Sequence, residues 1–196
     1  HLKRNNKKEG MYALKMVASE LTDAQFGVLK VQLANLYRAY SANPPKTPKT
    51  PEEWAHKAVA TMEAKYPMTL ASVADGKYVG TDGRRIHLAH TSLADSLYDV
   101  GAQSVSSEAN FPNWRQVVPV LGGHTLVDPD TAAHRIDGEL IRFDFGDLGE
   151  LCLNAKFYAD VQSCPEGMQM YVKDSTSIVG FVGATCEAYL MPFRAK

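Results

Sequence analysis

Two Asp-Gly pairs constrain the middle of this chain more than any other feature of its sequence. Residues 68–74 and 77–81 flank Asp75-Gly76, and both runs repeat their apolar side chains with a period of two. An Asp-Gly pair between such runs is the strongest short-range signal for a two-residue hairpin turn, because both central residues must adopt positive φ. A second pair, Asp82-Gly83, leads into another strand-like run at 84–88. The sequence therefore predicts three consecutive antiparallel strands.

The residues before these strands predict a strand and two helices. Residues 11–17 are strand-like, and an apolar stripe with a capping box at its start predicts a helix over 22–40. Residues 41–51 contain four prolines and predict a stiff, extended connector. Thr50 as N-cap, Pro51 in the first turn and Glu53 completing a capping box then predict a second helix over 52–65.

The C-terminal part repeats this order of elements. Residues 92–110 are small and polar and predict a loop. Residues 139–145 alternate as a strand does, and Asn154 is suited to cap a short helix that ends near residue 163. Three more strand-like runs follow, at 168–173, 177–182 and 185–191.

Together these elements predict an α+β protein with two βαβββ-like halves, at 11–110 and 111–196. The helix after the proline-rich connector is an insertion in the first half. Residues 1–10 are polar and basic, and Met11 resembles a natural start. We interpret this decamer as a flexible basic arm or a vector-derived remnant.

Composition is that of an ordinary globular protein. Of the 196 residues, 45% are apolar and 22% charged, and the formal net charge is −1. No apolar run approaches the length of a membrane span, and the N-terminus lacks the apolar core of a signal peptide, so we expect a cytoplasmic protein without a membrane partner.

The balanced charge excludes a basic footprint for nucleic acid over the whole chain, which leaves a local face for any DNA contact. The three cysteines have no CxxC spacing and are expected to be reduced core residues.

The sequence holds no recognisable catalytic motif. It has no dinucleotide-binding glycine pattern, no phosphate-binding loop, no nucleophile elbow and no HExxH pair. His87 and His90 fall on opposite faces of a strand, which suits two surface or hairpin histidines better than a metal site. Asp128, Asp130 and His134 are interpreted as solvated loop residues. We therefore expect a protein that is not an enzyme and that binds neither a cofactor nor a metal.

Two segments stand out for a different reason. Residues 111–119 (FPNWRQVVP) combine two prolines, two aromatic residues and an apolar end. They predict a connecting strand that packs its aromatic rings on the core. Residues 188–194 (AYLMPFR) bring an apolar run close to the end of the sequence. Such a run either completes a sheet or lines a groove.

These segments together resemble the bacterial sliding clamp family, the β subunit of DNA polymerase III. Residues 70–90 contain TDGRRIHLAH, which is similar to the family's TDGHRLA-like motif. Residues 111–119 are similar to its interdomain FPDYRRVLP-type segment. Residues 151–194 are similar to its last helix and final strands, including the MPMR-like tail. The three blocks occur in the family's order.

The resemblance implies a DNA-clamp fold and a role as a processivity factor without a catalytic site of its own. It implies a homo-oligomeric ring that encircles duplex DNA without reading sequence and that docks short motifs of polymerase and clamp-loader-type proteins. The hydrophobic pocket carried over from the family consists of Thr81, Gly83, Arg84, Arg85, Ile86, Pro119, Asn154, Phe157, Tyr189, Leu190, Met191, Pro192, Phe193 and Arg194. The residues expected to face DNA are Lys30, Arg38, Lys57 and Lys65.

This sequence also departs from the family. An ordinary clamp subunit has three domains and nearly twice this length, so the chain resembles a shortened or divergent member. Arg84 replaces a histidine, and Phe157 replaces a tyrosine. Two other hypotheses remain open at this point. The first is a non-ring relic of a clamp that keeps only the peptide pocket and competes for partners, and the second is an unrelated small α+β enzyme.

Overall fold

The structure is a computed structural model that describes residues 47–61, 68–99, 103–105 and 110–194. All of these residues belong to one compact unit of the chain. Several predictions fall outside them: the arm 1–10, the strand 11–17, the helix 22–40, the first part of the connector, the end of the helix 52–65, and Lys30, Arg38 and Lys65.

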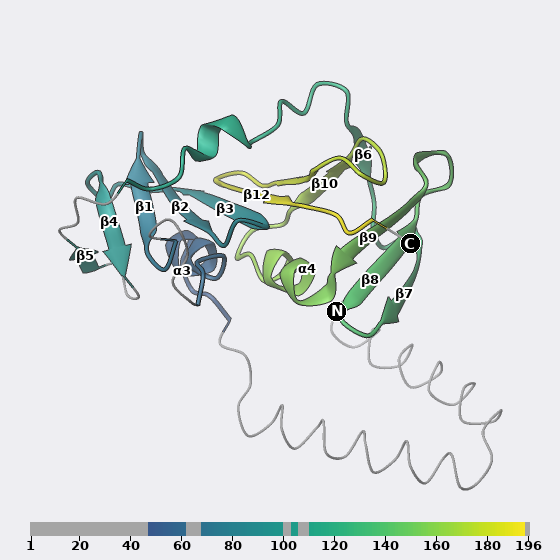
Figure 1. The fold of residues 1–196 in the computed structure, drawn as a ribbon, viewed down its shortest axis with the longest axis horizontal. Helices are drawn as coiled ribbons and strands as arrows, with labels where there is room; N and C mark the ends of the chain where they lie inside the picture. Colours follow the sequence, from purple (N-terminus) through teal and green to yellow (C-terminus); the bar gives the residue numbers. More distant parts are fainter. Residues whose placement is uncertain (1–46, 62–67, 100–102, 106–109, 195–196) are drawn as a thin grey trace, which may run out of the picture. The chain divides into compact units, whose positions relative to one another are not determined.

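The described residues form a mixed α+β fold around two antiparallel sheets (Figure 1). The larger sheet has nine strands in the order β5-β4-β1-β2-β3-β12-β11-β10-β6, and the smaller has three in the order β7-β8-β9. The strands are β1 (Ala71–Ala74), β2 (Lys77–Thr81), β3 (Arg85–His90), β4 (Ser96–Asp99), β5 (Gln103–Val105), β6 (Thr125–Val127), β7 (Ala133–Asp137), β8 (Leu140–Asp144), β9 (Glu150–Asn154), β10 (Gln169–Val172), β11 (Val179–Val182) and β12 (Cys186–Leu190). The helices are α3 (Pro51–His56) and α4 (Ala155–Gln162), with 3-10 turns η1 (Trp114–Gln116) and η2 (Gly146–Leu148).

The first Asp-Gly pair forms the predicted hairpin. Asp75 and Gly76 have φ of 54° and 69° and connect β1 to β2, whose register pairs Ala74 with Lys77. A positive φ at both central residues gives the turn a twist that matches the flanking strands. β2 then pairs with β3, so the prediction of three consecutive antiparallel strands is confirmed.

Helix α3 is much shorter than the predicted helix over 52–65. Thr50 caps it as expected, since its Oγ1 accepts from the backbone N–H of Glu53 at 3.2 Å. The Glu53 carboxylate does not complete the predicted capping box, because it accepts from the N–H of Lys49 instead. After His56 the α-helical pattern ends, and each backbone N–H from Lys57 to Val59 donates to the carbonyl three residues before it. The N–H of Ala60 then donates to the carbonyl of Met68. The chain thus folds back toward β1 where a longer helix was predicted.

Gly80 on β2 lets α3 approach the sheet. A Cβ added at this position would lie 2.2 Å from the carbonyl oxygen of Ala55, which no real contact permits. The close approach buries Trp54 and Ala55 completely. Only glycine fits at this point of the sheet.

Helix α4 forms as predicted from its cap. The Asn154 side chain accepts from the N–H of Phe157 at 3.0 Å, and the helix ends at Gln162. Tyr158 extends from α4 to both sheets, with its ring centroid 5.2 Å from that of Phe143 on β8 and 6.1 Å from that of Phe181 on β11. The helix therefore joins the two sheets through one hydrophobic core. Cys186 belongs to that core and the half-buried Cys164 packs against it, whereas Cys152 is buried outside this cluster.

Several predictions of irregular structure are wrong. Residues 92–110, predicted as a loop, contain β4 and β5, and β4 pairs with β1 through the buried residues Leu97 and Tyr98. Strands β6, β7 and β9 were not predicted from the sequence. Conversely, residues 111–119 are not a connecting strand, because Trp114–Gln116 form a 3-10 turn with Trp114 packed on the larger sheet.

Candidate functional site

A cavity of about 260 Å³ lies where the β2–β3 turn, the segment around η1 and the end of β12 meet. Its walls are mainly apolar, and its floor is the second hydrophobic cluster, in which Trp114 packs with Ile86 and Tyr189. The lining residues are Met68, Thr81, Gly83, Arg84, Arg85, Ile86, Pro112, Asn113, Trp114, Val117, Ile178, Tyr189 and Met191.

The structure brings half of the predicted pocket residues to this cavity. Five of them come from the β2–β3 turn and its flanking strand residues, and two come from the end of β12 and the residue after it: Thr81, Gly83, Arg84, Arg85, Ile86, Tyr189 and Met191. The other half does not line it: Pro119, Asn154, Phe157, Leu190, Pro192, Phe193 and Arg194.

The non-lining residues have other positions in the fold. Leu190 is buried in the core and pairs with Arg85 across β12 and β3. Phe193 lies beside β9, where its N–H donates to the carbonyl of Cys152 at 2.8 Å. Asn154 caps α4, and the ring of Phe157 packs on the Arg85 guanidinium at 4.2 Å. Phe157 therefore contacts Arg85, which lines the cavity, but does not line the cavity itself.

The segment 111–119 contributes differently from the prediction. The N–H groups of Val117 and Val118 both donate to the carbonyl of Trp114, and this tight turn brings 112–117 against the sheet. Pro112 therefore lines the cavity, whereas Pro119 lies beyond it. The cavity is thus lined by Pro112 in place of the predicted Pro119. Five further lining residues were not predicted: Met68, Asn113, Trp114, Val117 and Ile178.

The β2–β3 turn is held by side-chain hydrogen bonds. The Thr81 hydroxyl donates to the carbonyl of Arg85 at 2.7 Å and accepts from the N–H of Gly83 at 3.1 Å. The Asp82 carboxylate accepts from the N–H groups of Arg84 and Arg85 at 2.9 and 3.1 Å. The turn that forms one rim of the cavity is therefore fixed by its own sequence, TDGRR.

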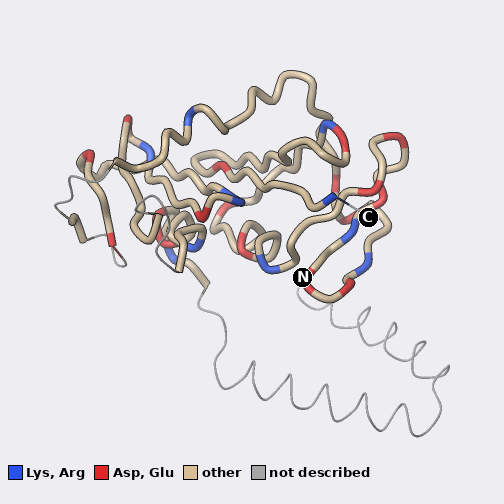
Figure 2. The backbone as a smooth tube through the Cα atoms, in the orientation of Figure 1, with Lys and Arg blue, Asp and Glu red and all other residues tan. Residues whose placement is uncertain are grey.

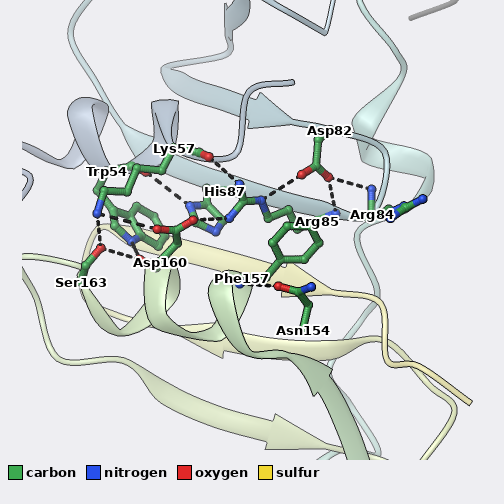
Figure 3. A network of polar contacts seen from close by, with 10 residues as sticks. All are labelled: Trp54, Lys57, Asp82, Arg84, Arg85, His87, Asn154, Phe157, Asp160 and Ser163. Atoms are coloured by element: carbon green, nitrogen blue, oxygen red, sulfur yellow. Dashed lines mark hydrogen bonds and ion pairs between the residues drawn. The ribbon is translucent and has the colours of Figure 1, made fainter. Parts of the chain in front are cut away.

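Arg85 is the centre of a buried polar network beneath the cavity (Figure 3). Its side chain is only 5% exposed. The guanidinium donates to Asp82 at 3.0 Å, to Asp160 at 2.6 Å and to the carbonyl of Lys57 at 2.7 Å. Such charge-assisted bonds satisfy a buried cation that would otherwise be costly. The network ties α3, β3 and α4 together, so it holds the cavity's lower wall in place.

His87 adjoins this network. Of the two predicted alternatives, a surface or a hairpin histidine, it is the second, because it lies in the β2–β3 hairpin and is completely buried. Its ring stacks on Trp54 with centroids 4.4 Å apart, and its Nδ1 lies 3.3 Å from the Trp54 carbonyl. Its Nε2 has no partner among the described residues. Burial, reinforced by Arg85, lowers the pKa of His87 to about 3, so the ring is neutral at physiological pH.

We expect mild acid to destabilise the fold through His87. The unfolded ring takes up a proton near its ordinary pKa of 6.5, whereas the folded ring does not until about pH 3. The stability contributed by the neutral ring is therefore fully present well above pH 6.5 and is lost as the pH falls through that value, by about 1.4 kcal/mol at pH 5.5. Urea denaturation at pH 7.5, 6.5 and 5.5 measures this slope. His87→Phe should flatten the slope and the exposed-site control His90→Phe should not, and an unchanged slope in His87→Phe would contradict this account.

The residues considered for chemistry do not converge. Asp128 and Asp130 are exposed in a turn, as expected, whereas His134 lies on β7 rather than in a loop. Among residues 47–61, 68–99, 103–105 and 110–194, no group of three or more His, Cys, Asp or Glu side chains is placed to hold a metal ion. No helix in that part of the chain is long and apolar enough to cross a membrane.

Lys57 is the one predicted DNA-facing residue that the structure describes. Its ammonium donates to Ser163 at 2.8 Å and lies 3.9 Å from the Asp160 carboxylate. Along the described backbone, Lys and Arg are interspersed with Asp and Glu (Figure 2).

Comparison with solved structures decides the fold. The β subunit of DNA polymerase III from Caulobacter crescentus superimposes with a TM-score of 0.52 at 16% identity. The chain has the fold of a bacterial sliding clamp. The sliding clamp of Pseudomonas aeruginosa gives a TM-score of 0.52 at 14% identity, and that of Bartonella birtlesii, bound to griselimycin, gives 0.53 at 15%.

The match to these clamps is partial on both sides. It covers 73%, 73% and 74% of this chain but only 62%, 63% and 63% of the clamps from Caulobacter, Pseudomonas and Bartonella. The chain therefore spans less than two thirds of the length of these sliding clamps. No family model matches the sequence, and no curated protein matches it. The likeness is thus one of fold.

Proposed function

We propose that this chain is a sliding-clamp-like DNA replication protein, which encircles duplex DNA as a homo-oligomer and docks short motifs of polymerase and other partners. The observation that carries this proposal is the apolar cavity between β3, η1 and β12 in a clamp fold. In this proposal the protein is an accessory factor, and the polymerase that it tethers supplies the chemistry.

The cavity is suited to short peptide motifs. Its volume of about 260 Å³ is slightly below the usual range of small-molecule pockets, and Met68, Ile86 and Met191 make its walls apolar. Burying one Leu or Phe side chain in such a site contributes about 1.5–3 kcal/mol. One or two such anchors, with hydrogen bonds to the peptide backbone, give an expected affinity in the micromolar range.

Val117 offers a direct test of peptide docking. Its side chain lines the cavity and is 57% exposed, so a charge introduced there should leave the fold intact. Val117→Asp places a carboxylate on an apolar wall, and we expect it to weaken a clamp-binding peptide by tenfold or more, since an apolar contact is lost and a charge must be desolvated. Isothermal titration calorimetry with such a peptide from a bacterial replicative polymerase measures the effect.

Val120→Asp is the matched control for this test. Val120 lies three residues further on, is 89% exposed and does not line the cavity. The same charge there should leave the affinity within about twofold of the wild type, as for a surface change away from the site. Equal weakening by both substitutions, or no binding by the wild-type chain, would refute docking at this cavity.

DNA encirclement is the second part of the proposal, and it rests on the fold. Clamp-type rings contact phosphates without reading sequence, so the proposed DNA contact should weaken as salt rises. The alternative is a non-ring module that keeps the peptide pocket and competes for clamp partners. The ion pairing of Lys57 and the interspersed charges favour that alternative. Ring assembly on duplex DNA separates the two.

A further inference from the structure

Two of the three cysteines meet between the end of α4 and the start of β12. Cys164 follows the last turn of α4, and its backbone N–H donates to the carbonyl of Val161 at 3.0 Å. Cys186 is the first residue of β12. The two lie 22 positions apart in the sequence, yet the Cys186 S–H donates a hydrogen bond to the Cys164 sulfur. The two sulfur atoms are therefore neighbours in the reduced protein.

Other contacts hold the same two segments together. The Glu166 carboxylate accepts from the backbone N–H of Thr185 at 2.8 Å and from the Thr185 hydroxyl. A Cβ added at Gly183 would lie 2.9 Å from a Glu166 carboxylate oxygen, so the segments touch there as well. Cys164 also packs against the hydrophobic core to which Cys186 belongs. The position of one thiol beside the other is thus fixed by the packing around them.

The two thiols differ in access and in acidity. Cys186 is completely buried, whereas Cys164 is half-buried, so a reagent from solution meets Cys164 first. The hydrogen bond from Cys186 lowers the pKa of the Cys164 thiol and outweighs the opposing effects of burial and of the Glu166 carboxylate. Donating that hydrogen bond, together with burial, raises the pKa of Cys186. Because the thiolate is the nucleophile, Cys164 is the reactive member of the pair.

We infer that Cys164 and Cys186 form a reversible disulfide when the protein meets a hydroperoxide, with Cys164 reacting first and Cys186 resolving the product. An accessible thiol with a second thiol beside it is typical of cysteines that respond reversibly to oxidation. Both remain reduced until the oxidant arrives, in agreement with their expected resting state. This inference does not depend on the proposed function.

The reaction has two steps. The Cys164 thiolate attacks the hydroperoxide, the O–O bond breaks, an S–O bond forms, and the departing alkoxide or hydroxide takes up a proton. The Cys186 sulfur then attacks the Cys164 sulfur, an S–S bond forms, the S–O bond breaks, and the departing hydroxide leaves as water with the Cys186 proton. The two thiols together lose two electrons, and the hydroperoxide gains them.

The fold is suited to accept this bond at its Cys164 end. A disulfide requires a sulfur–sulfur distance of about 2.05 Å, so one side chain has to move closer than a hydrogen bond demands. Cys186 is fixed in β12, where it pairs with Ala89 of β3. Cys164 lies beyond the end of α4 and is half-buried, so it is the side chain that can adjust. We expect the oxidised protein to unfold at a higher urea concentration, because the bond restricts the unfolded chain.

The test treats the full chain with hydrogen peroxide and counts the remaining thiols by alkylation in urea and intact-mass spectrometry. We expect the wild type to keep one of its three thiols, to run as a single chain on a denaturing, non-reducing gel, and to recover all three thiols in dithiothreitol. In Cys164→Ser we expect the remaining thiols to be lost at least about tenfold more slowly, because the reactive thiol is absent.

Cys152→Ser is the matched control, because Cys152 is a buried cysteine on β9 outside the pair. It should lose both of its remaining thiols at the wild-type rate. Retention of all three thiols by the treated wild type would overturn the inference, as would a cross-link that includes Cys152 or joins two chains. Thiol loss that dithiothreitol does not reverse would also overturn it, since Cys164 would then be overoxidised in place of forming the disulfide.

Discussion

Asp160→Ala is expected to lower the free energy of unfolding by about 3 kcal/mol, although Asp160 lies at the edge of the buried network. The substitution leaves the Arg85 guanidinium, 5% exposed, with a single carboxylate in place of two. Removing one partner of a buried ion pair costs about 3–5 kcal/mol, because the remaining charge stays desolvated. We take the lower end of that range since Asp82 still accepts from Arg85. Urea denaturation followed by circular dichroism measures the change.

Two further variants make this prediction specific. Asp95→Ala removes an exposed carboxylate and should change stability by less than about 0.5 kcal/mol. The double variant Arg85→Met, Asp160→Ala also removes the unpaired cation, so its cost should fall short of the sum of the two single costs by at least about 1 kcal/mol. Strictly additive costs would show that Arg85 and Asp160 do not interact as the structure places them.

Gly80→Ala is expected to destabilise the fold by about 3 kcal/mol, which is large for one added methyl group. The new Cβ would lie 2.2 Å from the Ala55 carbonyl oxygen and 3.3 Å from a methyl group of Val59. The closest atom belongs to the backbone, so α3 has to move away from β2, and the stack of Trp54 on His87 opens. Urea denaturation gives the loss of stability, and near-ultraviolet circular dichroism reports on the Trp54 ring.

Gly167→Ala is the control for this substitution. A Cβ at Gly167 meets no atom within 4 Å and needs no unusual φ, so the change should be neutral or slightly stabilising. Wild-type stability in Gly80→Ala, with an unchanged aromatic spectrum, would mean that α3 does not pack on β2 at this distance.

Local signals in the sequence were enough for the elements that depend on a few neighbouring residues. The Asp75-Gly76 turn and the Asn154 cap each follow from side-chain or backbone preferences within four residues, and both are present in the structure. The predicted helix over 52–65 failed because its continuation competes with a tertiary contact. The Ala60 N–H bonds to Met68 instead of extending the helix.

The strands that were not predicted lack the alternation of apolar and polar residues on which strand prediction depends. Leu151, Cys152 and Leu153 on β9 are all buried, so both faces of that strand are apolar. All five residues of β7 are exposed, so neither face shows an apolar pattern. In β4 only Leu97 and Tyr98 are buried, and two adjacent apolar residues in a polar segment are too few to predict a strand.

The candidate site shows the same limit at longer range. The TDGRR turn and Tyr189 with Met191 were identified from their resemblance to the clamp family, and the structure brings them to one cavity. The partner of Arg85 was not predictable, because Asp160 is 75 residues away in the sequence. The burial of His87 likewise depends on Trp54, which reaches it from another element.

Topological retention on DNA tests the proposed clamp function most directly. The chain would be loaded on nicked circular duplex DNA, its mass determined by light scattering, and the complex passed over a gel-filtration column before and after linearisation of the circle. The proposal predicts a closed homo-oligomer that stays with the circle and is lost from the linear duplex by sliding off its ends. A monomer that elutes apart from both DNA forms would contradict the ring and leave the non-ring peptide-binding module.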